Sequence, residues 1–167
     1  VQFAFTISFH ILWPTLNIGL GLLLLLWEAL WMRTGDERYE RLYKYWVKIF
    51  SLSFGLGVVT GVPLAYQFGT NFAQYSAYAG SVIGPLLGVE VMTAFFLESV
   101  FVGIMLFGWG RFSPQVHFLA TVFVVIGSFN SSFWVIAANS WMQTPQGVSL
   151  IDGRLVVDSW WDVIFNP

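Results

Sequence analysis

The chain has 167 residues, of which 57% are hydrophobic, 19% aromatic and only 10% charged. Soluble domains carry about 25% charged residues, so this composition excludes an ordinary soluble domain and predicts a membrane protein. The net charge of −2 is uninformative about nucleic acid, but no basic patch exists outside one short loop, so no nucleic acid partner is expected. The absence of cysteine excludes Cys-ligated iron–sulfur clusters and Cys-zinc sites. The chain starts without Met, and we expect it to be a piece of a longer protein.

Four apolar stretches are long enough to cross a bilayer as helices, which requires roughly 20 residues each. We therefore predict an all-α transmembrane fold, a four-helix membrane bundle that forms part of a larger multi-span subunit. Residues 1–167 are expected to form a single membrane domain, with spans over about 3–31, 49–67, 85–109 and 116–141 and an extracytoplasmic tail over 142–167.

The first predicted span holds a histidine and a proline four residues apart. Pro14 has no backbone N–H to donate to the carbonyl of His10, so we expect a kink there, which membrane helices tolerate when neighbours satisfy the freed carbonyl. His10 is either a metal or haem ligand presented to the interior of the bundle or a hydrogen-bonded helix histidine. Its position alone does not separate the two interpretations.

Two motifs concern the packing of the second and fourth spans. Gly57 and Gly61 form a small-xxx-small pattern, which lets helix backbones approach closely. Ser131 is one of several polar residues of the fourth span that we expect to make interhelical hydrogen bonds, with a proton-path role as the less common alternative. His117, at the head of that span, is expected to be interfacial and structural.

The third predicted span carries two carboxylates, Glu90 and Glu98. A carboxylate at membrane depth costs on the order of 3 kcal/mol, so two in one span call for a function. On a regular α-helix their spacing separates them by roughly 80° in azimuth and about 12 Å in depth. This arrangement indicates a ligand or gate with a deeper proton carrier beneath it.

The connections between the spans set the expected orientation. Residues 32–48 form a charged connection with five of the seven basic residues, the connection after the third span holds one, and residues 68–83 hold none. By the positive-inside rule, the first and third connections face the cytoplasm, whereas the N-terminus and the tail face outward. We also expect an interfacial loop over 68–83 and a small surface hairpin over 151–157.

This orientation allows two depths to be compared. His10 lies about seven residues and Glu90 about five residues from the outer ends of their spans, which places both roughly 8 to 10 Å below the outer interface. A histidine and a glutamate at matching depth on different helices can address the two faces of one buried cofactor, while Glu98 lies deeper. Imidazole with carboxylate suits iron, so the residues indicate a redox or proton-coupled membrane site without specifying haem.

Several segments together resemble one known family, subunit I of the cytochrome bd-type quinol oxidases. The similarity extends over all four spans and corresponds to about the first third of such a subunit. Several of the segments are most similar to the cyanide-insensitive branch of the family. The segments are Gln2–His10 (QFAFTISFH), Phe54–Gly61 (FGLGVVTG), Tyr66–Asn71 (YQFGTN), Glu90–Glu98 (EVMTAFFLE) and Ala138–Gly147 (ANSWMQTPQG).

The resemblance implies a role for each candidate residue. His10 would be an axial ligand of a high-spin haem at the oxygen-reducing site, and Glu90 would be the carboxylate that ligates or faces a haem iron there. Glu98 would be the proton-conducting glutamate, with Ser131 as a further member of the path. The family oxidises quinol and reduces dioxygen to water, so Glu90 and Glu98 are the expected catalytic residues, and His10 and Glu90 the expected metal ligands.

The resemblance also implies cofactors and partners. The cofactors would be a high-spin haem b and either haem d or only b-type haems, while the low-spin haem b ligands and the ubiquinol or menaquinol site lie outside this chain. The partners would be the rest of subunit I, a second oxidase subunit, membrane lipid and dioxygen, in the bacterial inner (cytoplasmic) membrane. Phe72 departs from the pattern, since many relatives have Trp there.

From the residues alone, two other classes of function stay open. A proton- or cation-coupled transporter would use Glu90 and Glu98 as carrier carboxylates and would show no haem absorption. A cytochrome b-like membrane anchor of a dehydrogenase usually needs paired histidines within spans, and here only His10 is well placed.

Overall fold

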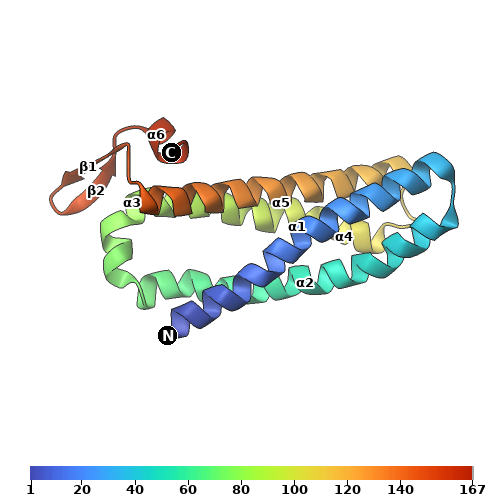
Figure 1. The fold of residues 1–167 in the computed structure, drawn as a ribbon, viewed down its shortest axis with the longest axis horizontal. Helices are drawn as coiled ribbons and strands as arrows, with labels where there is room; N and C mark the ends of the chain where they lie inside the picture. Colours follow the sequence, from blue (N-terminus) through green and yellow to red (C-terminus); the bar gives the residue numbers. More distant parts are fainter. Residues whose placement is uncertain (167) are drawn as a thin grey trace.

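The computed structural model describes residues 1–166, apart from the side chains of residues 94 and 95. It is an elongated helical bundle with a small tail at one end (Figure 1). The helical elements are α1 (Gln2–Thr34), α2 (Glu37–Thr70), α3 (Ala73–Met92), the π-helical segment η1 (Thr93–Glu98), α4 (Ser99–Phe107) and α5 (Pro114–Gln143). The tail holds β1 (Val148–Ile151), β2 (Arg154–Val157) and the short helix α6 (Trp160–Ile164).

Four helical stretches of the described chain are long and apolar enough to cross a membrane, namely α1, α2, α5 and the rod formed by α3, η1 and α4. This confirms the predicted all-α transmembrane class. The hairpin predicted over 151–157 is present as the antiparallel pair of β1 and β2, and it begins three residues earlier than expected, at Val148.

The helices extend further than their apolar parts. The connection predicted over 32–48 is helical except at Gly35 and Asp36, because charged side chains form ion pairs one turn apart along the start of α2, such as Arg41 with Glu37 at 3.1 Å. Gly35 ends α1 in the left-handed conformation at φ 69°, and the Asp36 carboxylate accepts a hydrogen bond from the backbone N–H of Arg38 at 2.9 Å.

The interfacial loop predicted over 68–83 is likewise mostly helical. Only Asn71 and Phe72 interrupt it, and α3 begins at Ala73. The Ser76 hydroxyl donates to the backbone carbonyl of Phe68 at 2.5 Å and closes this turn. The early part of α3 crosses from the end of α2 toward α5 (Figure 1). Aromatic and small residues suit a membrane interface as a helix as well as a loop, so composition did not reveal the helix start.

Two buried apolar clusters hold the bundle together. One joins α1, α2, α4 and α5 near the turn between α1 and α2, and the other joins α3, α5 and the tail. The first consists of Leu20, Leu24, Tyr43, Val47, Phe50, Val102, Met105 and Val124, and the second of Ala79, Val82, Ile83, Leu86, Ala138, Trp141, Leu155 and Val163.

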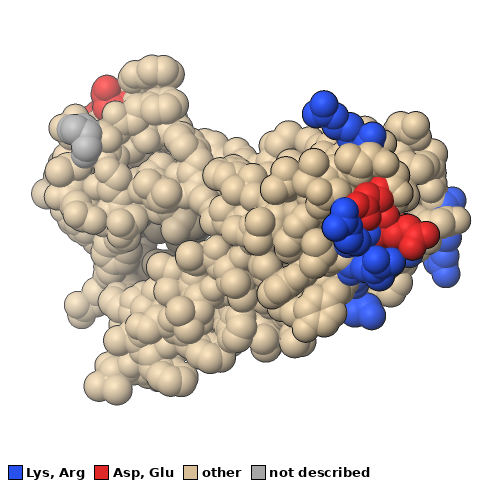
Figure 2. Space-filling model, turned by 45° about the vertical axis from the view of Figure 1, so that its right-hand side comes forward, with Lys and Arg blue, Asp and Glu red and all other residues tan. Residues whose placement is uncertain are grey.

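The bundle is tight at one end and divided at the other. In the described chain, α1 packs along α2 and α5 but not along α3, which packs along α5. Away from the turn between α1 and α2, the α1–α2 pair diverges from the α3–α5 pair (Figure 1). The space-filling view shows lysines and arginines gathered at one end and a hollow in the opposite half (Figure 2). The fold therefore leaves room between its two helix pairs.

Candidate functional site

His10 lies on α1 and is held against α2. Its Nδ1 lies 2.9 Å from Oγ1 of Thr60, whose hydroxyl proton is directed to the backbone carbonyl of Leu56 at 2.7 Å. The threonine oxygen can therefore accept a hydrogen bond from Nδ1 in the tautomer that carries its proton there. This tautomer leaves the Nε2 lone pair available as a metal ligand, with the ring orientation fixed by Thr60.

The glycines of the small-xxx-small pattern make room for this arrangement. A Cβ on Gly61 would lie 3.2 Å from Cε1 of His10, and a Cβ on Gly57 would lie 3.6 Å from Cβ of Trp13. The expected close approach of the helix backbones is therefore present between α1 and α2, and the ring of His10 rests against the surface of α2.

Glu90 lies on the other helix pair. The Ser131 hydroxyl of α5 donates to Oε1 of Glu90 at 2.7 Å. One turn further along the chain, at the start of η1, the Asn130 amide donates to the Thr93 hydroxyl at 3.1 Å. Ser131 thus makes the interhelical hydrogen bond expected of it, and its partner is the candidate carboxylate itself.

Glu98, at the end of η1, is buried, with only 6% of the residue exposed. Its carboxyl lies beside Ser128 of α5, while its Oε1 has no hydrogen-bond partner in the described part of the chain. It also interacts electrostatically with Glu90. The structure therefore brings Glu90, Glu98 and Ser131 together along one side of α5.

The π-helical segment between the two glutamates corrects the predicted azimuth. The i→i+5 pattern of a π-helix turns the chain by fewer degrees per residue than an α-helix, so the separation of roughly 80° calculated for a regular helix does not apply across residues 93–98. Both carboxylates instead contact α5, Glu90 at Ser131 and Glu98 at Ser128. Segments of this kind frequently occur at functional sites.

His10 and Glu90 belong to different helix pairs, and each offers one ligand. In the part of the chain that the structure describes, no three His, Asp or Glu side chains converge on a point where they could hold a bare metal ion. One imidazole nitrogen and one carboxylate, approached from separate helices, fit a planar cofactor that carries its own equatorial metal donors. The donor set therefore fits a haem.

A second polar cluster, which the sequence did not reveal, lies near the turn between α1 and α2. Oε1 of Glu28 lies 2.6 Å from Nδ1 of His117, and the Thr121 hydroxyl donates to Oε2 of Glu28 at 2.5 Å. The hydroxyl of Tyr43 lies 3.0 Å from that of Thr121. All four residues are buried. His117 is therefore buried against the other helices, with Glu28 as its partner inside the bundle.

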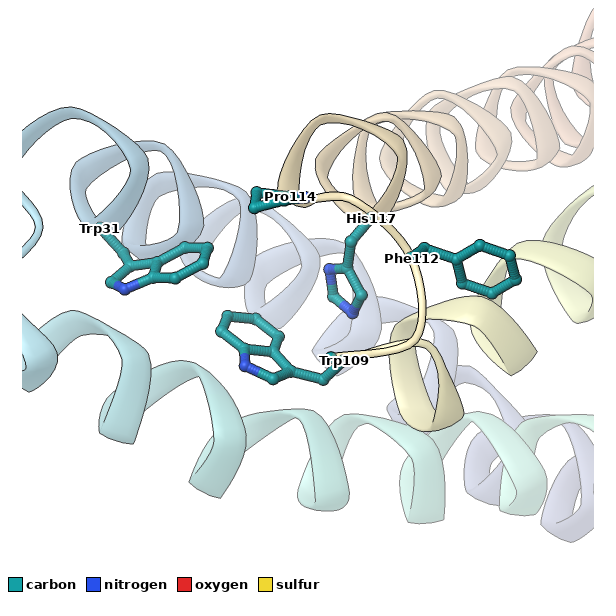
Figure 3. A pocket seen from close by; sticks show the side chains of 6 residues that line it. Trp31, Trp109, Phe112, Pro114 and His117 are labelled. Atoms are coloured by element: carbon teal, nitrogen blue, oxygen red, sulfur yellow. The ribbon is translucent and has the colours of Figure 1, made fainter.

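Both ring nitrogens of His117 face oxygen atoms inside the bundle. Nδ1 of His117 faces the Glu28 carboxylate, and Nε2 faces the backbone carbonyl of Met105 at 3.2 Å, so both ring nitrogens have acceptors. Beside the imidazole lies a pocket of about 160 Å³ (Figure 3), lined by Trp31, Trp109, Gly110, Phe112, Pro114 and His117. The sequence held one sign of this contact. Glu28 lies near the expected cytoplasmic end of the first span, and His117 lies near the expected cytoplasmic end of the fourth.

The fold and the site define a multi-span helical membrane protein in which intramembrane histidine and carboxylate side chains face α2 and α5. The family model for cytochrome bd terminal oxidase subunit I matches residues 1–167. The chain belongs to this family, which confirms the resemblance found in the sequence.

Relatives of known name and structure agree with this membership. The chain is 40% identical over 167 residues to cytochrome bd ubiquinol oxidase subunit 1 of Bacillus subtilis (strain 168), covering 100% of this chain and 36% of that protein. It is 42% identical over 168 residues to cytochrome bd-II ubiquinol oxidase subunit 1 of Escherichia coli (strain K12), covering 99% and 33%.

The structure of bd oxidase from Geobacillus thermodenitrificans superposes with a TM-score of 0.90 at 33% identity, covering 96% of this chain and 37% of that chain. The chain thus spans about a third of the length of these relatives.

Proposed function

We propose that this chain is part of a terminal respiratory oxidase that oxidises quinol and reduces dioxygen to water at a haem near the outer membrane face. The observation that carries the proposal is that the candidate residues lie on two separate helix pairs. His10 is held on the α1–α2 pair, and Glu90 and Glu98 are held on the α3–α5 pair. The two named relatives are ubiquinol oxidases, which supports quinol as the electron donor.

His10 and Glu90 are the residues that would hold the haem. When bound, the haem supplies the electron transfer to dioxygen. Thr60 keeps the imidazole of His10 in the Nδ1-protonated form, so that Nε2 is presented as the ligand. Ser131 holds the Glu90 carboxylate by a hydrogen bond of 2.7 Å. Both ligands are therefore oriented before the cofactor binds, which reduces the cost of binding it.

Protons would reach this site along α5. Glu98 takes up a proton from the cytoplasmic side, and the hydroxyls of Ser128 and Ser131 connect its surroundings to Glu90. Carboxyl and hydroxyl groups both donate and accept hydrogen bonds, so such a row can pass a proton without a charged side chain moving through the bilayer. The gathering of basic residues at the turn between α1 and α2 supports a cytoplasmic location for that end, and hence an outer N-terminus.

The remainder of the oxidase would complete the catalytic unit. The rest of subunit I would supply the low-spin haem ligands and the quinol site, and a second subunit and membrane lipid would cover the exposed apolar faces of the bundle.

Absorption spectroscopy of the purified full-length protein tests the haem site. The reduced-minus-oxidised spectrum should show haem bands, whereas a transporter would show none. His10→Ala should abolish the high-spin haem signal, because no second imidazole in the described chain is free to replace it, His117 being bonded at both ring nitrogens. A fully retained signal would refute the ligand role of His10.

Glu98→Gln tests the proton route. Oxygen reduction and proton uptake should both slow, while haem content should stay close to that of the unaltered protein because Glu98 is not a ligand. Glu37→Gln is the matched control, since Glu37 is an exposed glutamate at the other end of the bundle. Unchanged turnover and proton uptake in Glu98→Gln would count against a relay at this position.

A further inference from the structure

The side chain of Glu98 occupies the space that a side chain at position 127 would need. A Cβ built on Gly127 of α5 would lie 2.8 Å from Cγ of Glu98 and 3.2 Å from its Oε1. It would also lie 3.2 Å from Cδ2 of Leu97. Carbon atoms in folded proteins pack at about 3.5–4.0 Å, so position 127 cannot accept a methyl group unless Glu98 moves. The contact involves Cγ, close to the backbone of η1, rather than the mobile end of the side chain.

This contact is unusual among the helix glycines of the chain. A Cβ on Gly84, Gly88 or Gly103 would meet nothing within 4 Å. Alanine is a better helix former than glycine in a helix interior, so the propensity of α5 alone would favour alanine at position 127. The requirement for glycine there comes from the neighbouring glutamate.

The contact with Gly127 determines which carboxyl oxygen of Glu98 faces α5 at position 127. The residue is buried, its carboxyl lies beside Ser128, and Oε1, the oxygen that faces Gly127, has no hydrogen-bond partner in the described chain. Buried carboxyl oxygens are rarely left unpaired, because each one costs free energy that folding must recover elsewhere. An unpaired oxygen held in a defined place fits a group that must exchange a proton.

We propose that Gly127 is a positioning residue for proton transfer through Glu98. Together with the π-helical segment that ends at Glu98, the missing side chain of Gly127 forms a slot that holds the Glu98 carboxyl against α5 with Oε1 facing Gly127. This inference rests on the proposed function, in which Glu98 conducts protons to the oxygen-reducing site. Gly127 itself touches neither substrate nor cofactor.

The test is Gly127→Ala in the full-length oxidase. The rate of oxygen reduction should fall at least about tenfold, since a displacement of about 1 Å at a reacting group can cost that much or more. Haem content and the reduced-minus-oxidised spectrum should not change. Gly103→Ala is the matched control, because a methyl group there meets open space within the chain, and it should retain the original rate.

A second variant separates positioning from a general packing defect. Aspartate is one methylene shorter than glutamate, so Glu98→Asp withdraws the side chain from an added Cβ at position 127. The double variant Gly127→Ala/Glu98→Asp should therefore turn over severalfold faster than Gly127→Ala. The infrared C=O band of the Glu98 carboxyl, identified as the band lost in Glu98→Gln, should shift in Gly127→Ala and stay in place in Gly103→Ala.

The outcomes distinguish this inference from the proposed function. Original rates in Glu98→Gln would remove the proton route and this inference with it. A slow Glu98→Gln beside a Gly127→Ala variant with the original rate and an unshifted band would overturn only the role of Gly127, as would a double variant no faster than Gly127→Ala. If Gly127→Ala does not assemble, Gly127→Ala/Glu98→Ala should, and failure of that variant as well would also overturn the inference.

Discussion

Removing one member of the Glu28–His117 pair should destabilise the protein strongly. Glu28 has no exposed side-chain surface and His117 only 3%, so either residue left alone is a buried polar group without its partner. The 2.6 Å bond between them and the 2.5 Å bond from Thr121 would both be disturbed. Losing one partner of such a pair costs about 3–5 kcal/mol, and we expect Glu28→Leu and His117→Leu each to fall in this range.

The double variant decides whether the pair acts as a unit. Glu28→Leu/His117→Leu leaves no unpaired charge, so it should cost at least about 2 kcal/mol less than the sum of the two single changes. Denaturant titration of the full-length protein in micelles, followed by tryptophan fluorescence, measures the free energy of unfolding. The exposed pair Glu37–Arg41 is the control, with an expected coupling of at most about 0.5 kcal/mol. Additive single effects, or losses below about 1 kcal/mol, would refute the reasoning.

Three smaller predictions concern the helix contacts and the first turn. Thr60→Val should lower haem affinity about 10- to 100-fold by removing the partner of His10, whereas Thr60→Ser should keep it; haem titration measures both. Gly61→Ala should shift the high-spin haem absorption maximum, because the new Cβ lies 3.2 Å from the imidazole, and an unchanged spectrum would contradict this. The hydrogen bond from Arg38 lowers the pKa of the Asp36 carboxyl. The stabilisation that this bond gives is therefore present above the usual aspartate pKa and is lost as the pH falls through the lowered value. Asp36→Asn should make thermal unfolding less dependent on acid pH.

Hydropathy was sufficient to predict the four membrane helices and their order, because a bilayer requires long apolar segments with internally bonded backbones. It did not predict where the helices end. The ends depend on local backbone partners, such as the left-handed conformation of Gly35 and the side-chain acceptor of Asp36, which leave little trace in a hydropathy pattern.

The candidate residues could be selected from the sequence, but the contacts that they make could not. The cost of burying His10, Glu90 and Glu98 made them conspicuous in an apolar sequence. Residues 93–98 carry no composition that marks a π-helix, so the rotation that turns Glu98 toward α5 was not foreseen. The Glu28–His117 contact joins residues 89 positions apart, and such pairings are decided by packing rather than by local sequence.

The two-residue connection between α1 and α2 restricts how these helices can move. With only Gly35 and Asp36 between them, neither helix can shift along its axis relative to the other without breaking the turn. Each helix also contains a proline further from this turn, Pro14 in α1 and Pro63 in α2, in the part where the His10 ring contacts α2. A proline interrupts the backbone hydrogen bonding of a helix, so bending of α1 or α2 is expected at these positions, while the short turn holds the charged ends of the two helices together.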